Sequence, residues 1–101
     1  MRLEHYPLEK LKKEILEIVG KYLDLSKYRV FFFGSRVDNK GNERSDIDVG
    51  VEGDEKIPGA VLSAIREEID DLQTLYKIEV VDFKNVSRDF YKVASKNIEE
   101  I

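Results

Sequence analysis

The sequence predicts an α/β fold in which a small mixed β-sheet is covered by helices, mainly on one face. Apolar stripes at helical spacing alternate with short runs of β-forming residues, which gives the order helix, strand, short turn, strand, helix, strand, helix. A chain of 101 residues has the length of one domain that buries roughly two-thirds of its unfolded surface. We therefore expect residues 1–101 to form a single domain.

The first helix is predicted from Leu8 to Tyr22, where apolar residues recur along one helical face and Lys and Glu occupy the rest. The first strand is predicted from Arg29 to Gly34, because its Val-Phe-Phe-Phe run is apolar, β-favouring and too short for a typical helix. The chain then turns at Gly34-Ser35, and this short connection predicts that the next strand is antiparallel to the first.

The second strand is predicted where apolar and other residues alternate strictly, from Asp46 to Glu52. Alternation places its branched apolar residues on one face and both Asp46 and Asp48 on the other, about 7 Å apart along the backbone. The two aspartates could be the solvated face of a half-buried strand. However, Asp is depleted in strands, and no Lys or Arg lies between the two to relieve their repulsion.

The third strand is predicted from Lys77 to Phe83, after a helix from Val61 to Leu72. A helical crossover between two strands of one sheet usually makes them parallel, so that their beginnings lie side by side. This arrangement places Glu79 level with the aspartate pair, and Asp82 roughly 10 Å further along. Glu79 is the predicted third carboxylate. A solvent-exposed Glu at a strand end, and Asp82 in its place, are the alternatives.

The last predicted element is a helix that begins after a cap at Asn85 or Ser87. A mostly apolar stripe from Phe90 to Ile101 extends this helix to the last residue. Such a stripe must pack on its own sheet or contact another chain.

The Gly34-Ser35 turn and the aspartate pair together suggest phosphate chemistry. If a helical turn begins at Gly34, its free N–H groups form an anion site that a phosphate can approach closely. Phosphoryl transfer needs such donors, together with acidic oxygens that hold Mg²⁺ ions about 3.5–4 Å apart. The loop that follows is basic and rich in turn formers: we expect Arg36 to contact phosphate, while Lys40 and Arg44 fit either this role or a plain surface loop.

Composition limits the classes of function. A net charge of −4 argues against a broad nucleic-acid surface, because phosphate backbones are held by clustered Lys and Arg. Without cysteine there is no disulfide, thiolate metal site or cysteine nucleophile. No apolar run is long enough to span a membrane, and the N-terminal residues lack an apolar signal region, so the expected location is the cytoplasm.

The spacing of these residues resembles a known family. Gly34-Ser35, ten intervening residues and Asp46-x-Asp48 resemble the signature of the DNA polymerase β-type nucleotidyltransferases, and FFFGSR…SDIDVGV is close to their minimal nucleotidyltransferase branch. The resemblance covers nearly the whole chain and implies a palm-like fold and transfer of AMP from ATP to an acceptor hydroxyl. The family usually has Asp at the place of Glu79.

The resemblance also implies the roles of individual residues. Two Mg²⁺ ions would be held by three residues that are both catalytic and metal-binding: Asp46, Asp48 and Glu79. Nucleotide binding would involve Gly34, Ser35, Arg36 and Ser45.

The resemblance further implies a partner. Members of the minimal branch accompany an all-helical HEPN protein, often a toxic ribonuclease, which some of them neutralise by adenylylating a tyrosine. We expect this protein to be the antitoxin of such a pair, and Phe90, Val93, Ile98 and Ile101 are candidates for the contact. One alternative is a catalytically weak nucleotide-binding module that neutralises its partner by binding. A divalent-cation binder without nucleotide is another, although it leaves the Gly34-Ser35 turn unexplained.

Overall fold

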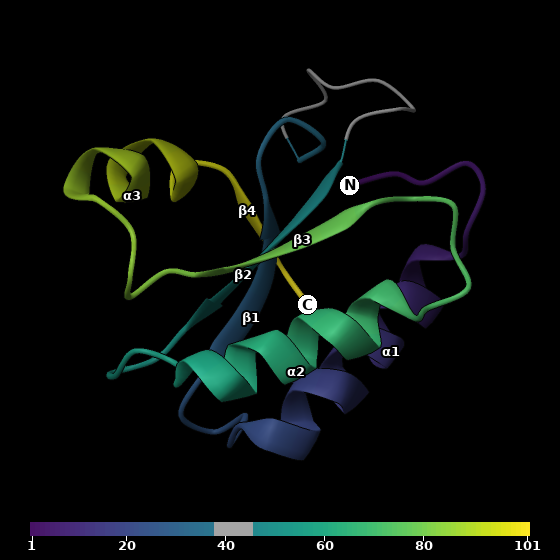
Figure 1. The fold of residues 1–101 in the computed structure, drawn as a ribbon. Coiled ribbons are helices and arrows are strands. Elements are labelled where there is room, and N and C mark those ends of the chain that lie inside the picture. Colours follow the sequence, from purple (N-terminus) through teal and green to yellow (C-terminus); the bar gives the residue numbers. More distant parts are fainter. Residues whose placement is uncertain (38–45) are drawn as a thin grey trace.

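A computed structural model of the chain describes residues 1–37 and 46–101. These residues form an α/β fold, as the sequence predicts, and Figure 1 shows its helices and strands. In chain order they are α1 (Leu8–Tyr22), β1 (Arg29–Phe33), β2 (Ile47–Glu52), α2 (Gly59–Asp70), β3 (Ile78–Asp82), α3 (Arg88–Ala94) and β4 (Ile98–Glu100).

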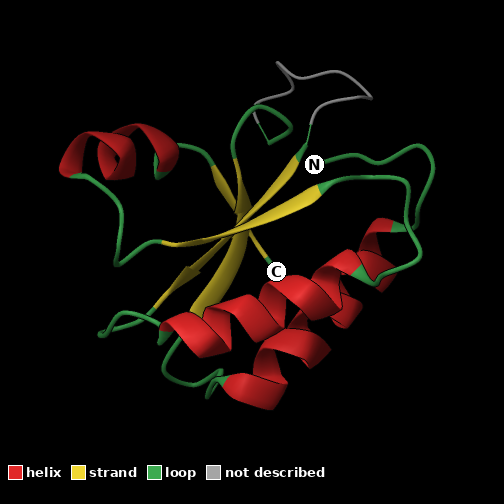
Figure 2. Ribbon diagram, viewed as in Figure 1, coloured by secondary structure: helices red, strands yellow, loops and turns green. Residues whose placement is uncertain are grey.

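The strands form one mixed sheet in the order β3-β2-β1-β4, drawn in yellow in Figure 2. β1 and β2 are antiparallel, and β2 and β3 are parallel, which confirms both predicted orientations. The crossover through α2 accounts for the parallel pair, since parallel neighbours need a connection of this length.

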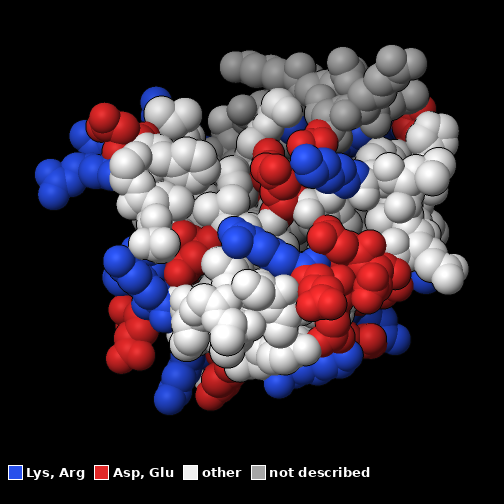
Figure 3. Space-filling model, viewed as in Figure 1, with Lys and Arg blue, Asp and Glu red and all other residues white. Residues whose placement is uncertain are grey.

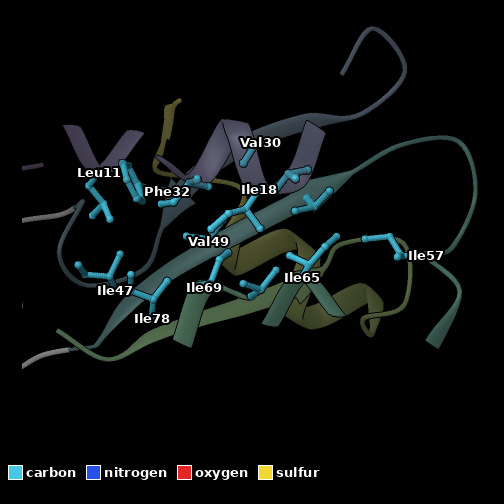
Figure 4. Packing of buried hydrophobic residues seen from close by; sticks show 14 residues of the cluster. Leu11, Ile18, Val30, Phe32, Ile47, Val49, Ile57, Ile65, Ile69 and Ile78 are labelled. Atoms are coloured by element: carbon cyan, nitrogen blue, oxygen red, sulfur yellow. The ribbon is translucent and has the colours of Figure 1, made fainter. Parts of the chain in front are cut away.

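The main core lies between the sheet and the helix pair formed by α1 and α2 (Figure 1). The alternation in β2 sends Ile47, Val49 and Val51 into this core, where they are fully buried. Figure 4 shows how side chains from both helices interdigitate with those of the sheet. The fully buried helix residues are Leu11, Ile15, Val19 and Ile65, and Ile69 is nearly so.

A smaller aromatic cluster lies on the opposite face of the sheet, under α3. Phe83 packs edge-to-face against both Phe31 and Phe33, with ring centroids 4.8 and 4.9 Å apart. Gly50 leaves room for these rings, because a Cβ there would overlap both Phe31 and Phe83. α3 has no buried residue, so this face is covered less completely than the other.

The C-terminal stretch differs from the prediction. Ser87 is the N-cap, accepting a hydrogen bond from Phe90 N at 3.1 Å, but the helix ends at Ala94 and does not reach Ile101. Residues 98–100 instead form β4, antiparallel to β1. Without β4, N–H and C=O groups on the outer edge of β1 would be unpaired. The hydrogen bonds that β4 makes to these groups stabilise the segment more than a short continuation of the helix would.

Charged side chains of both signs cover the surface. On the face drawn in Figure 3, Lys and Arg are mixed with Asp and Glu, and acidic side chains gather over the C-terminal end of α2. This mixture is unlike the clustered basic residues that hold a nucleic-acid backbone. Within residues 1–37 and 46–101, no helix is long and apolar enough to cross a membrane.

Candidate functional site

The register of β2 and β3 brings two of the predicted carboxylates together. Asp48 is paired directly with Glu79 in the parallel ladder, and neighbouring strands lie about 4.8 Å apart. Both side chains therefore project from the sheet face opposite the main core. Asp46 precedes Asp48 by two residues, just before the start of β2. The structure thus places Glu79 level with Asp48.

The electrostatics of Asp48 follow from this placement. Burial, together with the negative charges of Glu79 and Asp46, raises the pKa of the half-buried Asp48 carboxyl from about 3.8 to about 6. Glu79 and Asp46 are therefore each close enough to repel the Asp48 carboxylate. Lys77 gives only slight relief, since its Nζ lies 3.9 Å from Glu79 Oε1 on an exposed part of the surface.

The Gly34-Ser35 turn lies against the Asp48 carboxylate. Phe33 pairs with Asp48 across the antiparallel ladder, so the next residue begins the turn beside it. Gly34 has φ of +86°, and a Cβ at this position would overlap Asp48 Oδ2. The turn is closed by a hydrogen bond of 3.1 Å from Val37 N to Gly34 O. Gly34 is thus required both by backbone conformation and by the space that the carboxylate occupies.

Asp82, the alternative third carboxylate, lies on the other face of the sheet. It is paired with Val51, is 5% exposed, and accepts hydrogen bonds from the backbone N–H groups of Ile57 at 2.8 Å and Lys84 at 2.9 Å. Asp82 therefore holds the loops next to β2 and β3. The signal for this was present in the sequence, since an odd separation from Glu79 puts the two side chains on opposite faces.

Arg36 is placed differently from the other predicted nucleotide-binding residues. It is 9% exposed, and its guanidinium Cζ lies 4.7 Å from the centroid of the Tyr76 ring, in a cation–π contact. This contact ties Arg36 to the segment that enters β3. Ser45, together with Lys40 and Arg44 of the basic loop, lies outside the described residues.

A pocket of about 370 Å³ opens beside Asp48 and the glycine turn. One wall is formed by the end of β1 and the Gly34-Ser35 turn, and the other by α3 and the turn that follows it. The lining residues are Phe33, Gly34, Ser35, Asp48, Phe90, Val93, Ala94 and Asn97. Sequence reasoning did not include Asn97 in the site, because its position depends on β4, which was not predicted.

The donor chemistry of the site suits Mg²⁺. Carboxylate oxygens are the hard ligands that this ion prefers, and a cation would relieve the repulsion that, after burial, contributes to the raised pKa of Asp48. In the part of the chain that the structure describes, no group of three or more His, Asp and Glu side chains is already arranged around a common metal position.

The sequence and the fold are both similar to those of known proteins. Residues 13–101 match the family described as polymerase beta, nucleotidyltransferase. A protein of Haemophilus influenzae named "Probable protein adenylyltransferase MntA" is 27% identical over 88 residues, which cover 85% of this chain and 77% of that protein.

Solved structures share the fold at low sequence identity. A toxin–antitoxin structure with AMP-PNP matches with a TM-score of 0.70 and 14% identity, over 88% of this chain and 70% of the other. A complex of tri-AMPylated Shewanella oneidensis HEPN toxin with MNT antitoxin matches with a TM-score of 0.67 and 13% identity, over 91% and 69%. With the family match spanning most of the sequence, this chain belongs to the polymerase β nucleotidyltransferase family.

Proposed function

We propose that this protein is a Mg²⁺-dependent nucleotidyltransferase that moves AMP from ATP to a hydroxyl group on a HEPN-type protein. The observation that carries the proposal is the opposition of Asp48 and Glu79 beside the Gly34-Ser35 turn. This arrangement combines acidic oxygens for metal ions with a turn whose hydroxyl and backbone amides can donate hydrogen bonds to phosphate. Family membership and the adenylyltransferase name of the Haemophilus relative support the reaction type.

Each site residue has a separate proposed role. Two Mg²⁺ ions would be shared by Asp46 and Asp48, and Glu79 would hold the ion that activates the attacking hydroxyl. When bound, these ions neutralise phosphate charge and favour ionisation of the attacking hydroxyl. The Ser35 hydroxyl and neighbouring backbone amides bind the outer phosphates.

Two further residues are proposed for nucleotide binding, Arg36 and Ser45. Arg36 has the charge to contact a phosphate, although its Tyr76 contact means that the side chain would have to reach the nucleotide from this stacked position. Ser45 immediately precedes Asp46 and would bind nucleotide next to the metal ligands.

The proposed reaction is an in-line displacement at the α-phosphorus of ATP. The acceptor oxygen forms a new bond to the α-phosphorus, and the bond from that phosphorus to the oxygen bridging to the β-phosphate breaks. Pyrophosphate leaves with the bonding electrons. The proton of the acceptor hydroxyl passes to the Glu79 carboxylate, which lies at the exposed edge strand of the sheet where an acceptor can approach.

The proposed acceptor is a tyrosine of a helical HEPN partner, whose toxicity adenylylation would remove. The structural match is to a chain in a complex of a HEPN toxin with an MNT antitoxin, and this supports the choice of partner. Because ATP is the donor, we expect the reaction to take place in the cytoplasm.

The direct test is label transfer from ATP labelled at the α-phosphate, with Mg²⁺ and, as the acceptor, the purified protein that the neighbouring gene encodes. We expect label on the partner with the wild type and none with Asp48→Asn, because the half-buried carboxylate beside Glu79 is lost. Asp70→Asn is the matched control, since Asp70 is an exposed carboxylate at the end of α2.

Equal transfer by the wild type and Asp48→Asn would contradict the proposed site. A partner that binds tightly but acquires no label would favour the binding module. Calorimetry with Mg²⁺ and ATP, compared with Mg²⁺ alone, distinguishes the nucleotidyltransferase and the binding module from a plain cation binder, because the cation binder does not bind nucleotide.

A further inference from the structure

The pocket beside Asp48 has two chemically different walls. The wall at the Gly34-Ser35 turn carries a hydroxyl and lies against the Asp48 carboxylate. The opposite wall, formed by α3 and the turn after it, carries apolar side chains and one amide. Among the described residues that line this pocket there is no Lys or Arg, so the α3 wall offers no positive charge to a phosphate.

The apolar wall is fixed in position but open to solvent. The Phe90 ring packs at a steep angle against Phe33 and Phe83, with centroids 6.0 and 5.9 Å apart. It nevertheless remains 41% exposed, and Val93 beside it is 70% exposed. The rigid Phe90 ring and the exposed Val93 side chain lie at the mouth of the pocket, where they can pack against the flat ring of a ligand.

Asn97 supplies the polar group on the same wall. Within the described residues, its side chain makes no hydrogen bond to another group, and it lines the pocket next to Ala94. A side-chain amide presents a donor beside an acceptor, which is the pattern that pairs with the edge of a nucleobase such as adenine.

We propose that the α3 wall holds the nucleobase of the donor nucleotide, with Phe90 and Val93 against the ring and Asn97 hydrogen-bonded to its edge. The inference rests on the proposed nucleotidyl transfer and adds the residues that recognise the base. The phosphates lie on the Ser35 and Asp48 side of the same pocket, so one nucleotide spans both walls. α3, which the family signature does not include, thereby supplies the contacts to the base.

The test compares two ligands that differ only in the base. Binding of ATP and of ribose 5-triphosphate is measured by calorimetry with Mg²⁺, for the wild type, Asn97→Ala and Lys92→Ala. Lys92 is the control, because it is exposed on α3 and does not line the pocket. We expect Asn97→Ala to weaken ATP binding about tenfold, the loss of one good hydrogen bond, and to leave ribose 5-triphosphate unchanged.

A second variant, Phe90→Ala, tests the apolar part of the wall. We expect it to weaken ATP by tenfold or more with ribose 5-triphosphate unchanged, since stacking against an aromatic ring is sequence-tolerant but needs a base. Because Phe90 also packs on Phe33, its folding is checked by circular dichroism, and Asn97→Ala in the exposed turn decides the question if Phe90→Ala unfolds.

Three outcomes overturn the inference. In the first, the wild type binds both triphosphates with equal affinity. In the second, Asn97→Ala changes the affinities for both triphosphates by the same factor. In the third, Asn97→Ala weakens binding of the partner protein but not of ATP, which would make the wall a protein contact. In each case the proposed transfer still stands. If the wild type binds neither triphosphate, the proposed function itself fails and the inference fails with it.

Discussion

Replacing Asp48 with Asn is expected to stabilise the folded protein while removing its activity. Asp48 is half-buried, and burial together with the charges of Glu79 and Asp46 raises its pKa from about 3.8 to about 6. A difference of roughly 2 units corresponds to about 3 kcal/mol at 1.36 kcal/mol per unit. Because the carboxylate keeps part of its contact with water, screening reduces the expected gain to about 1–2 kcal/mol at pH 7.

The same pKa difference fixes how stability depends on pH. Between the unfolded pKa near 3.8 and the folded pKa near 6, the folded state keeps the Asp48 proton and the unfolded state has lost it. The contribution of Asp48 to the free energy of unfolding therefore falls as pH rises through this window, and is constant above it. Asn does not titrate, so the stability gain from Asp48→Asn should be near zero at pH 4 and complete by pH 7.

Urea denaturation with EDTA present, at several values between pH 4 and pH 8, measures this difference. Excess Mg²⁺ should narrow the gap at pH 7, because bound cations relieve the repulsion in the wild type. A variant that is less stable than the wild type at pH 7, or a gain that is the same at pH 4 and pH 7, would refute the reasoning.

Three other substitutions have definite expected effects. Gly34→Ala should cost about 1–3 kcal/mol, because it forces a side chain into positive φ, and should lower AMP transfer because its methyl group overlaps Asp48 Oδ2; unchanged denaturation and transfer would contradict this. Asp82→Asn should destabilise by about 1–3 kcal/mol in urea, opposite in sign to Asp48→Asn, because it can no longer accept both backbone N–H groups. Ser87→Ala should cost about 1 kcal/mol by removing the bond to Phe90 N, and a denaturation midpoint equal to that of the wild type would show that this cap is not stabilising.

The local parts of the fold could be predicted from sequence because periodicity carries them. The apolar stripe of Leu8–Tyr22 matches α1, and the alternation after Asp46 matches β2. The position of Glu79 next to Asp48 on the neighbouring strand could be predicted because a helical crossover makes the two strands parallel.

The parts that were missed depend on tertiary structure. β4 forms because β1 has an open edge, which no feature of Ile-Glu-Glu-Ile itself reveals. The α3 wall depends in turn on β4 and on the packing of Phe90 against Phe33, so Asn97 could not be assigned from its neighbours in sequence. The secondary structure of such short segments depends more on a few long-range interactions than on the intrinsic propensity of their residues.

The most direct test of the central claim is intact-mass analysis of the proposed HEPN-type partner after its co-expression with this protein. The proposed chemistry, built on Asp48 opposite Glu79, predicts one or more adenylyl groups on the partner with the wild type. It predicts an unmodified partner with Asp48→Asn, although that variant is expected to fold and to be at least as stable as the wild type. A partner that carries no adenylyl group with the wild type, or the same number with Asp48→Asn, would contradict the claim.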